Sequence, residues 1–148
     1  MKWITRKEIR VNRTATCWLI RRFLDPEAEF LFVPAEEVAS VQAEIGATGF
    51  DAPGATYPHR DKNSHCSFSS LVQERLAHDP VLVEMAQIVQ AADFNDQVDT
   101  HTAARGLALI SYGFPLVTGD DHETAQRASC LYDAPYASIG ESLKSQEA

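Results

Sequence analysis

The sequence predicts one compact domain of the α+β class, mainly helical with a small sheet of short strands. Its 148 residues fit a single domain. Hydrophobic residues make up 45% and charged residues 23%, as in globular proteins that bury a real core. Helical apolar spacing recurs along the chain, whereas runs typical of strands are few and short.

The first half of the chain alternates short strands with helices. We predict a strand over 2–5, a helix over 13–24, a strand over 29–34 and a helix over 35–45. The two strands are short runs rich in aromatic and β-branched residues. Asp25-Pro26 ends the first helix, because the residue before proline avoids the helical region. Gly46 ends the second helix.

A loop-rich stretch over 46–64, with short strands around Phe50 and Tyr57, leads into a helical second half. Helices are predicted over 67–77, 79–92, 102–112 and 120–138. Asp79-Pro80 is a strong helix start, and Gly113 is expected to end the third of these helices. Pro135 is expected to kink or break the last helix. The domain is therefore predicted to span 1–140, with a polar, frayed tail over 141–148.

The charge distribution is asymmetric. The net charge is −8, yet residues 1–22 hold seven basic residues and one acid, so they carry +6 and the rest carries −14. An acidic body is a poor partner for a phosphate backbone, so nucleic-acid binding by this domain is not expected. A solvated charged surface is the alternative to a functional basic patch.

Cysteine usage and apolar patterning favour a cytoplasmic protein. The three cysteines, Cys17, Cys66 and Cys130, form no disulfide framework, and they fit a reducing compartment. The sequence shows neither a secretory signal nor an apolar run long enough to span a membrane. It also lacks the glycine-rich fingerprints of nucleotide sites, so no nucleotide cofactor is expected.

Two polar residues occupy positions where helical spacing favours an apolar side chain. Asp93 prolongs the stripe that begins at Leu82, and a buried carboxylate needs a partner or a metal. His122 lies three residues before Ala125 on the stripe of the last helix, beside Asp121. The alternatives are that Asp93 caps the next segment and that His122 is an ordinary core histidine.

His59 and Cys66 add ligand types from the loop that precedes a helix. Cys66 stands at a predicted helix N-terminus, where the pKa of a thiol is lowered. We therefore expect a metal site of mixed donors built from His59, Cys66, Asp93 and His122, with Asp121 as an alternate ligand. These donors suit a divalent ion such as zinc, iron or manganese. The alternative is that His59 is an ordinary loop residue and that Cys66 is a small buried cysteine just before a helix.

Several motifs resemble one protein family. The run R-x-A-x-x-W-L-I-R-R-F-L-D-P-E-A-E-F-L-F-V-P extends from Arg13 to Pro34, and shorter motifs follow: F-D-x-P-G at 50–54, C-S-F at 66–68, A-D at 92–93 and D-D-H-E at 120–123. In this order they resemble the C-terminal domain of the chromate-resistance ChrB family, over nearly the whole chain. Family members typically read C-P-W-L-I where this chain has Thr16-Cys17-Trp18, so Cys17 is not expected to replace the family cysteine.

The resemblance implies a role in bacterial chromate resistance. Larger members are described as chromate-responsive regulators with an added N-terminal region, so this chain is expected to be the stand-alone form of the domain. Arg13, Arg21 and Arg22 would attract chromate, because the guanidinium fork matches oxyanion geometry. Three functions stay open: a domain that binds a metal and an oxyanion, a metal-dependent enzyme that reduces chromate or hydrolyses a substrate at the same site, and a non-enzymatic regulator. A homo-oligomer is possible.

Overall fold

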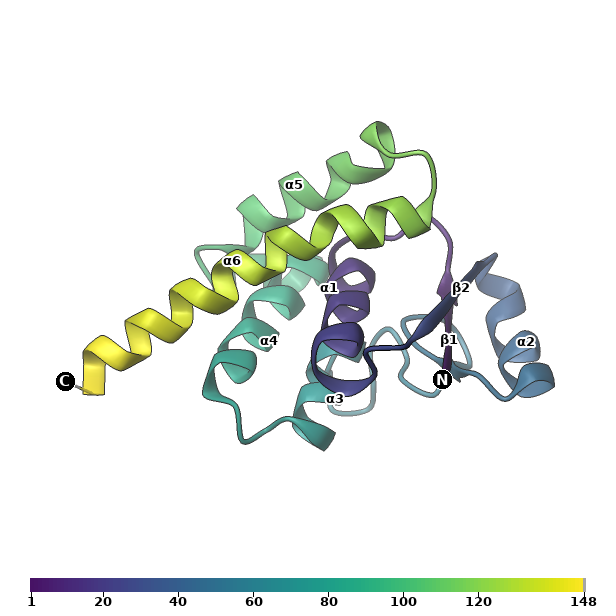
Figure 1. Cartoon of the computed structure of the whole chain (residues 1–148), viewed down its shortest axis with the longest axis horizontal. Helices are drawn as coiled ribbons and strands as arrows, with labels where there is room; N and C mark the ends of the chain where they lie inside the picture. Colours follow the sequence, from purple (N-terminus) through teal and green to yellow (C-terminus); the bar gives the residue numbers. More distant parts are fainter. Residues whose placement is uncertain (148) are drawn as a thin grey trace.

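A small parallel sheet lies at one end of a group of helices (Figure 1). The computed structural model describes residues 1–147. Three strands pair in the order β2-β1-β3: β1 spans Lys2–Arg6, β2 spans Glu29–Val33 and β3 spans Thr48–Gly49. Both pairings with β1 are parallel. The predicted class is confirmed, and so are the strands at 2–5 and 29–34.

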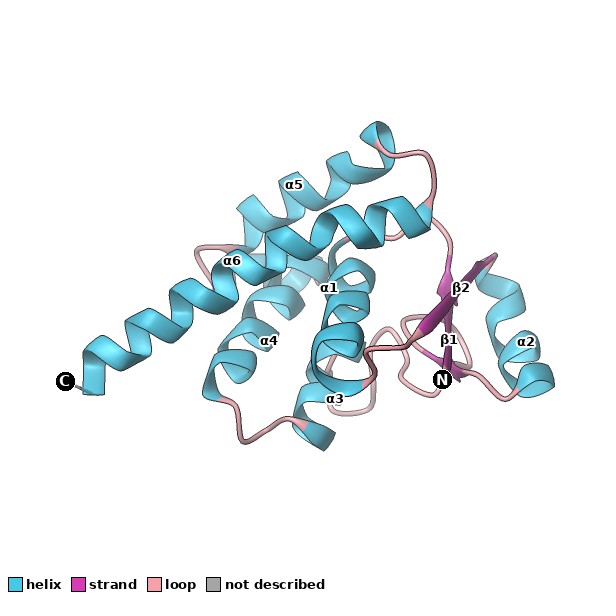
Figure 2. Cartoon of the chain, in the orientation of Figure 1, coloured by secondary structure: helices cyan, strands magenta, loops and turns pink. Residues whose placement is uncertain are grey.

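Each face of the sheet is covered by helices, as the alternation of strand side chains requires. Trp3 of β1 and Phe30 of β2 belong to the main core, together with helix α1, Val11–Leu19. Ile4 belongs to a second core with Val38 of helix α2, Val38–Ile45. Helix α2 therefore lies on one side of the strands and the remaining helices lie on the other (Figure 2).

The first helix joins two parallel neighbouring strands, so β1, α1 and β2 form a βαβ unit. Helix α1 spans Val11–Leu19 and continues as a π-helical turn over Ile20–Leu24. A short 3-10 turn at Ala35–Glu37 leads into α2, Val38–Ile45, which ends at Gly46 in the left-handed conformation, with φ of 67°. The predicted helix end at Gly46 is confirmed.

Four further helices complete the chain: α3 spans Ser67–Arg75, α4 spans Pro80–Asp93, α5 spans Ala104–Val117 and α6 spans Asp121–Glu147, with a 3-10 turn at Asn95–Thr100 between α4 and α5. The Asp79 carboxylate caps α4 by accepting the backbone N–H of Val81 at 2.9 Å. Helix α1 lies inside this group, with Ala15 and Leu19 fully buried. No helix within the described residues 1–147 is long and apolar enough to cross a membrane.

Two predicted helix ends are wrong. Helix α5 continues through Gly113 to Val117, and α6 continues through Pro135 to Glu147. In α6, Tyr132 before the proline and Tyr136 after it both pack on the main core, so packing holds the two halves in one helix. Residues 141–147 are consequently helical, whereas an irregular tail was expected.

Candidate functional site

Three side chains that could hold a metal ion meet beyond the carboxyl ends of β1 and β3. They are Asp51, His59 and Asp93, and one ligand atom from each lies within 4.8 Å of the others. His59 Nδ1 is 2.7 Å from Asp51 Oδ1 and 3.5 Å from Asp93 Oδ2. Crevices beyond the carboxyl ends of parallel strands are common ligand sites in α/β proteins.

Separate elements carry the three residues. Asp51 follows β3 and takes a positive φ of 52°, which is uncommon for a residue with a side chain. Its backbone N–H donates to the carbonyl of Tyr57 at 2.7 Å, and this bond fixes the turn. Asp93 is the last residue of α4. The ring of His59 packs edge-on against Phe94, with centroids 5.3 Å apart.

Two arginines neutralise the Asp51 carboxylate, whose side chain is only 1% exposed. Arg13 Nη1 lies 3.3 Å from Asp51 Oδ2, and Arg6 Nη2 lies 3.5 Å from Oδ1. Arg6 Nε also donates to the Asp51 carbonyl at 2.8 Å. Buried charges need such partners, and Asp51 has two of them.

The neighbours of Asp51 have shifted pKa values. The hydrogen bond to Asp51 raises the pKa of His59, with a further contribution from the charge of Asp93. Burial raises the pKa of Asp93 to about 6, and repulsion by Asp51 adds to the shift. Among the described residues, the buried Oδ2 atom of Asp93 has no hydrogen-bond partner. A carboxylate oxygen in that state is ready to accept a proton or a cation.

Arg13 lies deepest of the basic groups at this site. Burial lowers its pKa, although the charge of Asp51 opposes that shift. Its Nη2 donates to the carbonyl of Glu8 at 2.8 Å, while its Nε is buried without a partner in the described part of the chain. The guanidinium therefore connects the loop after β1 to the Asp51 carboxylate.

The donor set suits a divalent cation. One imidazole nitrogen and two carboxylate groups match the ligands of zinc, iron and manganese sites. The separations of 2.7 and 3.5 Å are in the range expected between ligand atoms that share one ion. A metal would require His59 Nδ1 to be deprotonated, since the lone pair of that nitrogen must face the ion.

His59 and Asp93 are thus brought together, as the predicted site requires, whereas Asp51 was missed. The sequence signal for Asp51 is the F-D-x-P-G motif at 50–54.

Cys66 does not join the cluster of ligand atoms. Its side chain is fully buried, and the thiol donates to Ser69 Oγ at 3.4 Å. Burial raises the pKa of Cys66 to about 12, although the residue precedes α3. The expected thiolate is therefore wrong, because desolvation outweighs the influence of the helix N-terminus.

Asp121 and His122 also lie outside the cluster. The Asp121 carboxylate accepts the backbone N–H groups of Glu8 at 3.1 Å and Ile9 at 2.9 Å. His122 is exposed and packs edge-on against Phe32 with ring centroids 4.9 Å apart. Its expected inward orientation is wrong: the side chain is exposed and lies against the Phe32 ring, whereas burial on this helix begins at Thr124.

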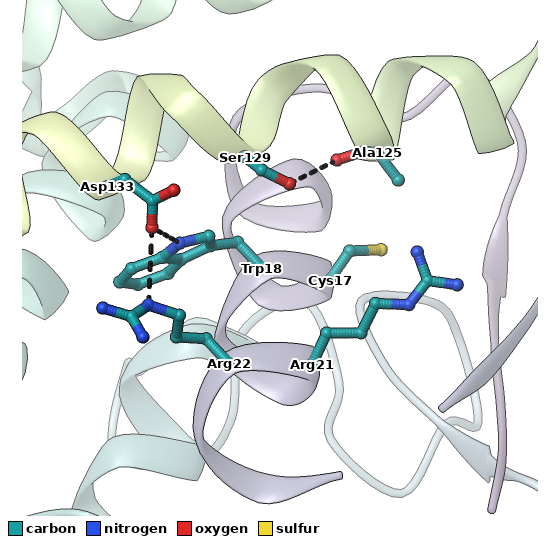
Figure 3. A pocket seen from close by; sticks show the side chains of 7 residues that line it. All are labelled: Cys17, Trp18, Arg21, Arg22, Ala125, Ser129 and Asp133. Carbon is teal, nitrogen blue, oxygen red and sulfur yellow. Dashed lines mark hydrogen bonds and ion pairs between the residues drawn. The ribbon is translucent and has the colours of Figure 1, made fainter. Parts of the chain in front are cut away.

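The three predicted oxyanion-binding arginines are divided between two places. Arg13 belongs to the Asp51 cluster, whereas Arg21 and Arg22 line a separate cavity of about 170 Å³ beside Cys17 (Figure 3). Arg13 and Arg21 share a helix face, but eight residues separate them by about 12 Å along the axis. Arg13 contacts Asp51 and Glu8, whereas Arg21 lies over the Phe30 ring.

The charged side chains that line the cavity beside Cys17 already have partners within the chain. Arg22 Nε lies 3.4 Å from Asp133 Oδ1, which also accepts the indole N–H of Trp18 at 2.9 Å. Arg21 stacks on the Phe30 ring at 4.6 Å. Burial raises the pKa of Cys17, so its thiol stays protonated. Both arginines of this cavity therefore already have contacts within the chain.

The fold and the cluster define a small α+β domain with a candidate metal site. Residues 3–139 match the family model described as ChrB, C-terminal domain, so the chain belongs to this family. It is 39% identical over 93 residues to Protein ChrB of Cupriavidus metallidurans. This match covers 62% of the chain and 27% of the relative, so the chain spans about a quarter of that protein's length. No solved structure matches the chain.

Proposed function

We propose that this domain binds a divalent metal ion through Asp51, His59 and Asp93, and a tetrahedral oxyanion such as chromate beside it. Membership of the ChrB family supports a role in chromate resistance. The proposed ligand set differs from the one expected from the sequence. Asp51 is added, and Cys66, Asp121 and His122 are left out. The oxyanion would contact Arg13, and neither Arg21 nor Arg22 would take part.

One observation carries the metal assignment. The buried Oδ2 of Asp93 lies 3.5 Å from His59 Nδ1 and has no hydrogen-bond partner within residues 1–147. Leaving such an atom unpaired costs about 1–3 kcal/mol. A cation between the two carboxylates removes that cost and the repulsion between them.

Formal charge supports the oxyanion. The carboxylates of Asp51 and Asp93 balance the guanidinium groups of Arg6 and Arg13, and a ligating His59 is neutral. The apo site would then be close to neutral. A bound divalent ion would give it a charge that matches a dianion, with Arg13 able to donate to its oxygens.

The state of Cys66 favours binding over chromate reduction. Reduction needs an electron donor near the bound oxyanion, and a thiol reacts as its thiolate. Cys66 is buried and its pKa is raised to about 12, so it is protonated at neutral pH. A binding or sensing role needs no such donor. The domain is accordingly proposed to bind chromate without reducing it.

Metal analysis of purified protein tests the assignment. We expect one equivalent of zinc, iron or manganese in the wild type after reconstitution. Asp93→Asn and His59→Ala should each weaken binding by at least tenfold in calorimetric titrations. His122→Ala is the matched control, because it removes an exposed imidazole outside the cluster. A wild type that takes up no stoichiometric metal contradicts the proposal, as does equal loss in the control.

A further inference from the structure

Helix α5 presents an apolar face to the solvent. Of the eight large hydrophobic side chains that are exposed in the described chain, five lie on this 14-residue helix. Leu116 is 85% exposed and Leu109 is 77% exposed, and Ile110 and Val117 are also more than half exposed. Contiguous exposed apolar surface marks an interaction site more often than scattered single residues do.

Two glycines lie between these side chains. Gly106 and Gly113 are spaced by seven residues, as are Leu109 and Leu116, so all four share one helix face. A Cβ added at either glycine would meet no atom within 4 Å in residues 1–147. Packing inside the chain therefore does not require glycine here, although each one costs the helix about 1 kcal/mol relative to alanine. Glycine on an exposed helix face allows another backbone to approach closely.

The face is self-complementary. Antiparallel pairing of two α5 helices about a two-fold axis at the level of position 111 places Leu109 beside Gly113 of the second copy. The same pairing places Leu116 beside Gly106 of the second copy, and both contacts repeat by symmetry. Each large side chain then lies level with a glycine, which allows the two helices to pack at close range.

Charge also favours a second copy at this face. The chain has a net charge of −8, so two copies repel each other in general. Residues 102–119 contain no acidic residue, and Arg105 is their one basic residue. Approach through α5 therefore avoids the charge that opposes association elsewhere.

We infer that α5 is the interface of a symmetric homodimer, with Leu109 and Leu116 as its central contacts. The face adjoins an apolar groove of about 380 Å³ between α4, α5 and α6, to which Gly106 and Ile110 contribute. In the antiparallel register, Val117 of the second copy lies at the level of Arg105, next to Gly106 at the edge of this groove. The interface is independent of the proposed metal site.

Sedimentation at about 50 μM tests the dimer. The wild type is expected to sediment as a dimer, and Leu116→Glu should sediment as a monomer because two buried glutamates would face apolar surface. Val83→Glu is the matched control, since it adds the same charge to an exposed apolar position on α4 and should leave the dimer intact.

Gly113→Leu separates loss of the interface from loss of the fold. A Cβ at position 113 meets no atom within 4 Å in residues 1–147, and leucine favours helix, so thermal stability of the monomer should hold or rise. The dimer should nevertheless dissociate, because the leucine fills the space opposite Leu109. A monomeric wild type, which would leave the face to a different partner, overturns the inference. So does a Gly113→Leu variant that stays dimeric.

Discussion

Asp51 and Asp93 share a single imidazole nitrogen. His59 Nδ1 lies 2.7 Å from the Asp51 carboxylate and 3.5 Å from that of Asp93. One N–H can serve one of them well, and Asp51 takes it because the arginines already hold its carboxylate in place. The Oδ2 atom of the second carboxylate is left buried without a hydrogen-bond partner among residues 1–147.

Asp93→Asn should stabilise the apo protein at neutral pH. The amide keeps the shape of the carboxylate and removes both the buried charge and the repulsion by Asp51. We expect a gain of about 1–3 kcal/mol in the free energy of unfolding at pH 7, measured by urea denaturation of metal-free protein. A metal ligand is expected to show both this gain in stability and a loss of metal affinity when it is replaced. Replacement of a residue that only supports the fold would lower stability instead.

The same variant should flatten the dependence of stability on pH. Burial raises the pKa of Asp93 to about 6 from its ordinary 3.8, so the folded protein binds this proton more tightly than the unfolded chain does. The resulting stabilisation is fully present below about pH 4 and is lost as the pH rises through 6. The advantage of Asp93→Asn over apo wild type should therefore grow by about 2 kcal/mol between pH 4 and pH 7. A constant difference would contradict the assignment.

Arg13→Gln should weaken oxyanion binding and leave metal binding in place. Arg13 supplies donors at the cluster, so chromate affinity of the metal-loaded protein should fall by about tenfold or more, which corresponds to one lost charge-assisted contact. Calorimetry with chromate, repeated with sulfate as a tetrahedral dianion, measures the effect. Arg22→Gln is the control, because Arg22 lies in the separate cavity with Asp133. Greater loss in Arg22→Gln than in Arg13→Gln would place the oxyanion in that cavity.

Asp121→Ala should destabilise the fold without removing a metal ligand. Its carboxylate accepts two backbone N–H groups in the loop after β1, and the loss should cost about 1–3 kcal/mol. Metal stoichiometry at saturating metal should stay at one per chain. Loss of the metal from folded Asp121→Ala protein would restore this residue to the ligand set.

The cysteines should differ sharply in reactivity. Cys17 and Cys66 are buried, whereas Cys130 is exposed. Because burial also raises the pKa values of the first two, a thiol reagent at pH 8 should label one equivalent rapidly in native protein and all three after unfolding. Rapid native labelling of two or three thiols would show that a buried cysteine is accessible. Cys130→Ser should abolish the rapid phase.

The strands and most helices could be predicted from sequence because their signals are local. Trp3 and Phe30 stand in short β-type runs, and the Asp79-Pro80 pair marks a helix start. The continuity of α6 through Pro135 could not be predicted, since it depends on packing of Tyr132 and Tyr136 against distant parts of the chain. Local propensity favoured a break, and tertiary contacts outweighed it.

The residues of the candidate site could likewise be predicted only in part. Asp93 was found because a carboxylate on an apolar helical stripe is conspicuous. Asp51 was missed because it lies in an irregular loop, where its place depends on strand pairing and a positive φ. His122 was misplaced because helical spacing gives the direction of a side chain and not the extent of the core in that direction.

Residues from much later in the sequence hydrogen-bond to the start of α1 and to the loop before it. Asp121 binds the N–H groups of Glu8 and Ile9, the Ser111 hydroxyl accepts the N–H of Val11, and Tyr132 donates to the Val11 carbonyl. The contacts that hold the start of α1, the helix that carries Arg13, are therefore complete only once α6 has been made. A chain that stopped before α6 would carry Asp51, His59 and Asp93 but would lack these contacts to the start of α1.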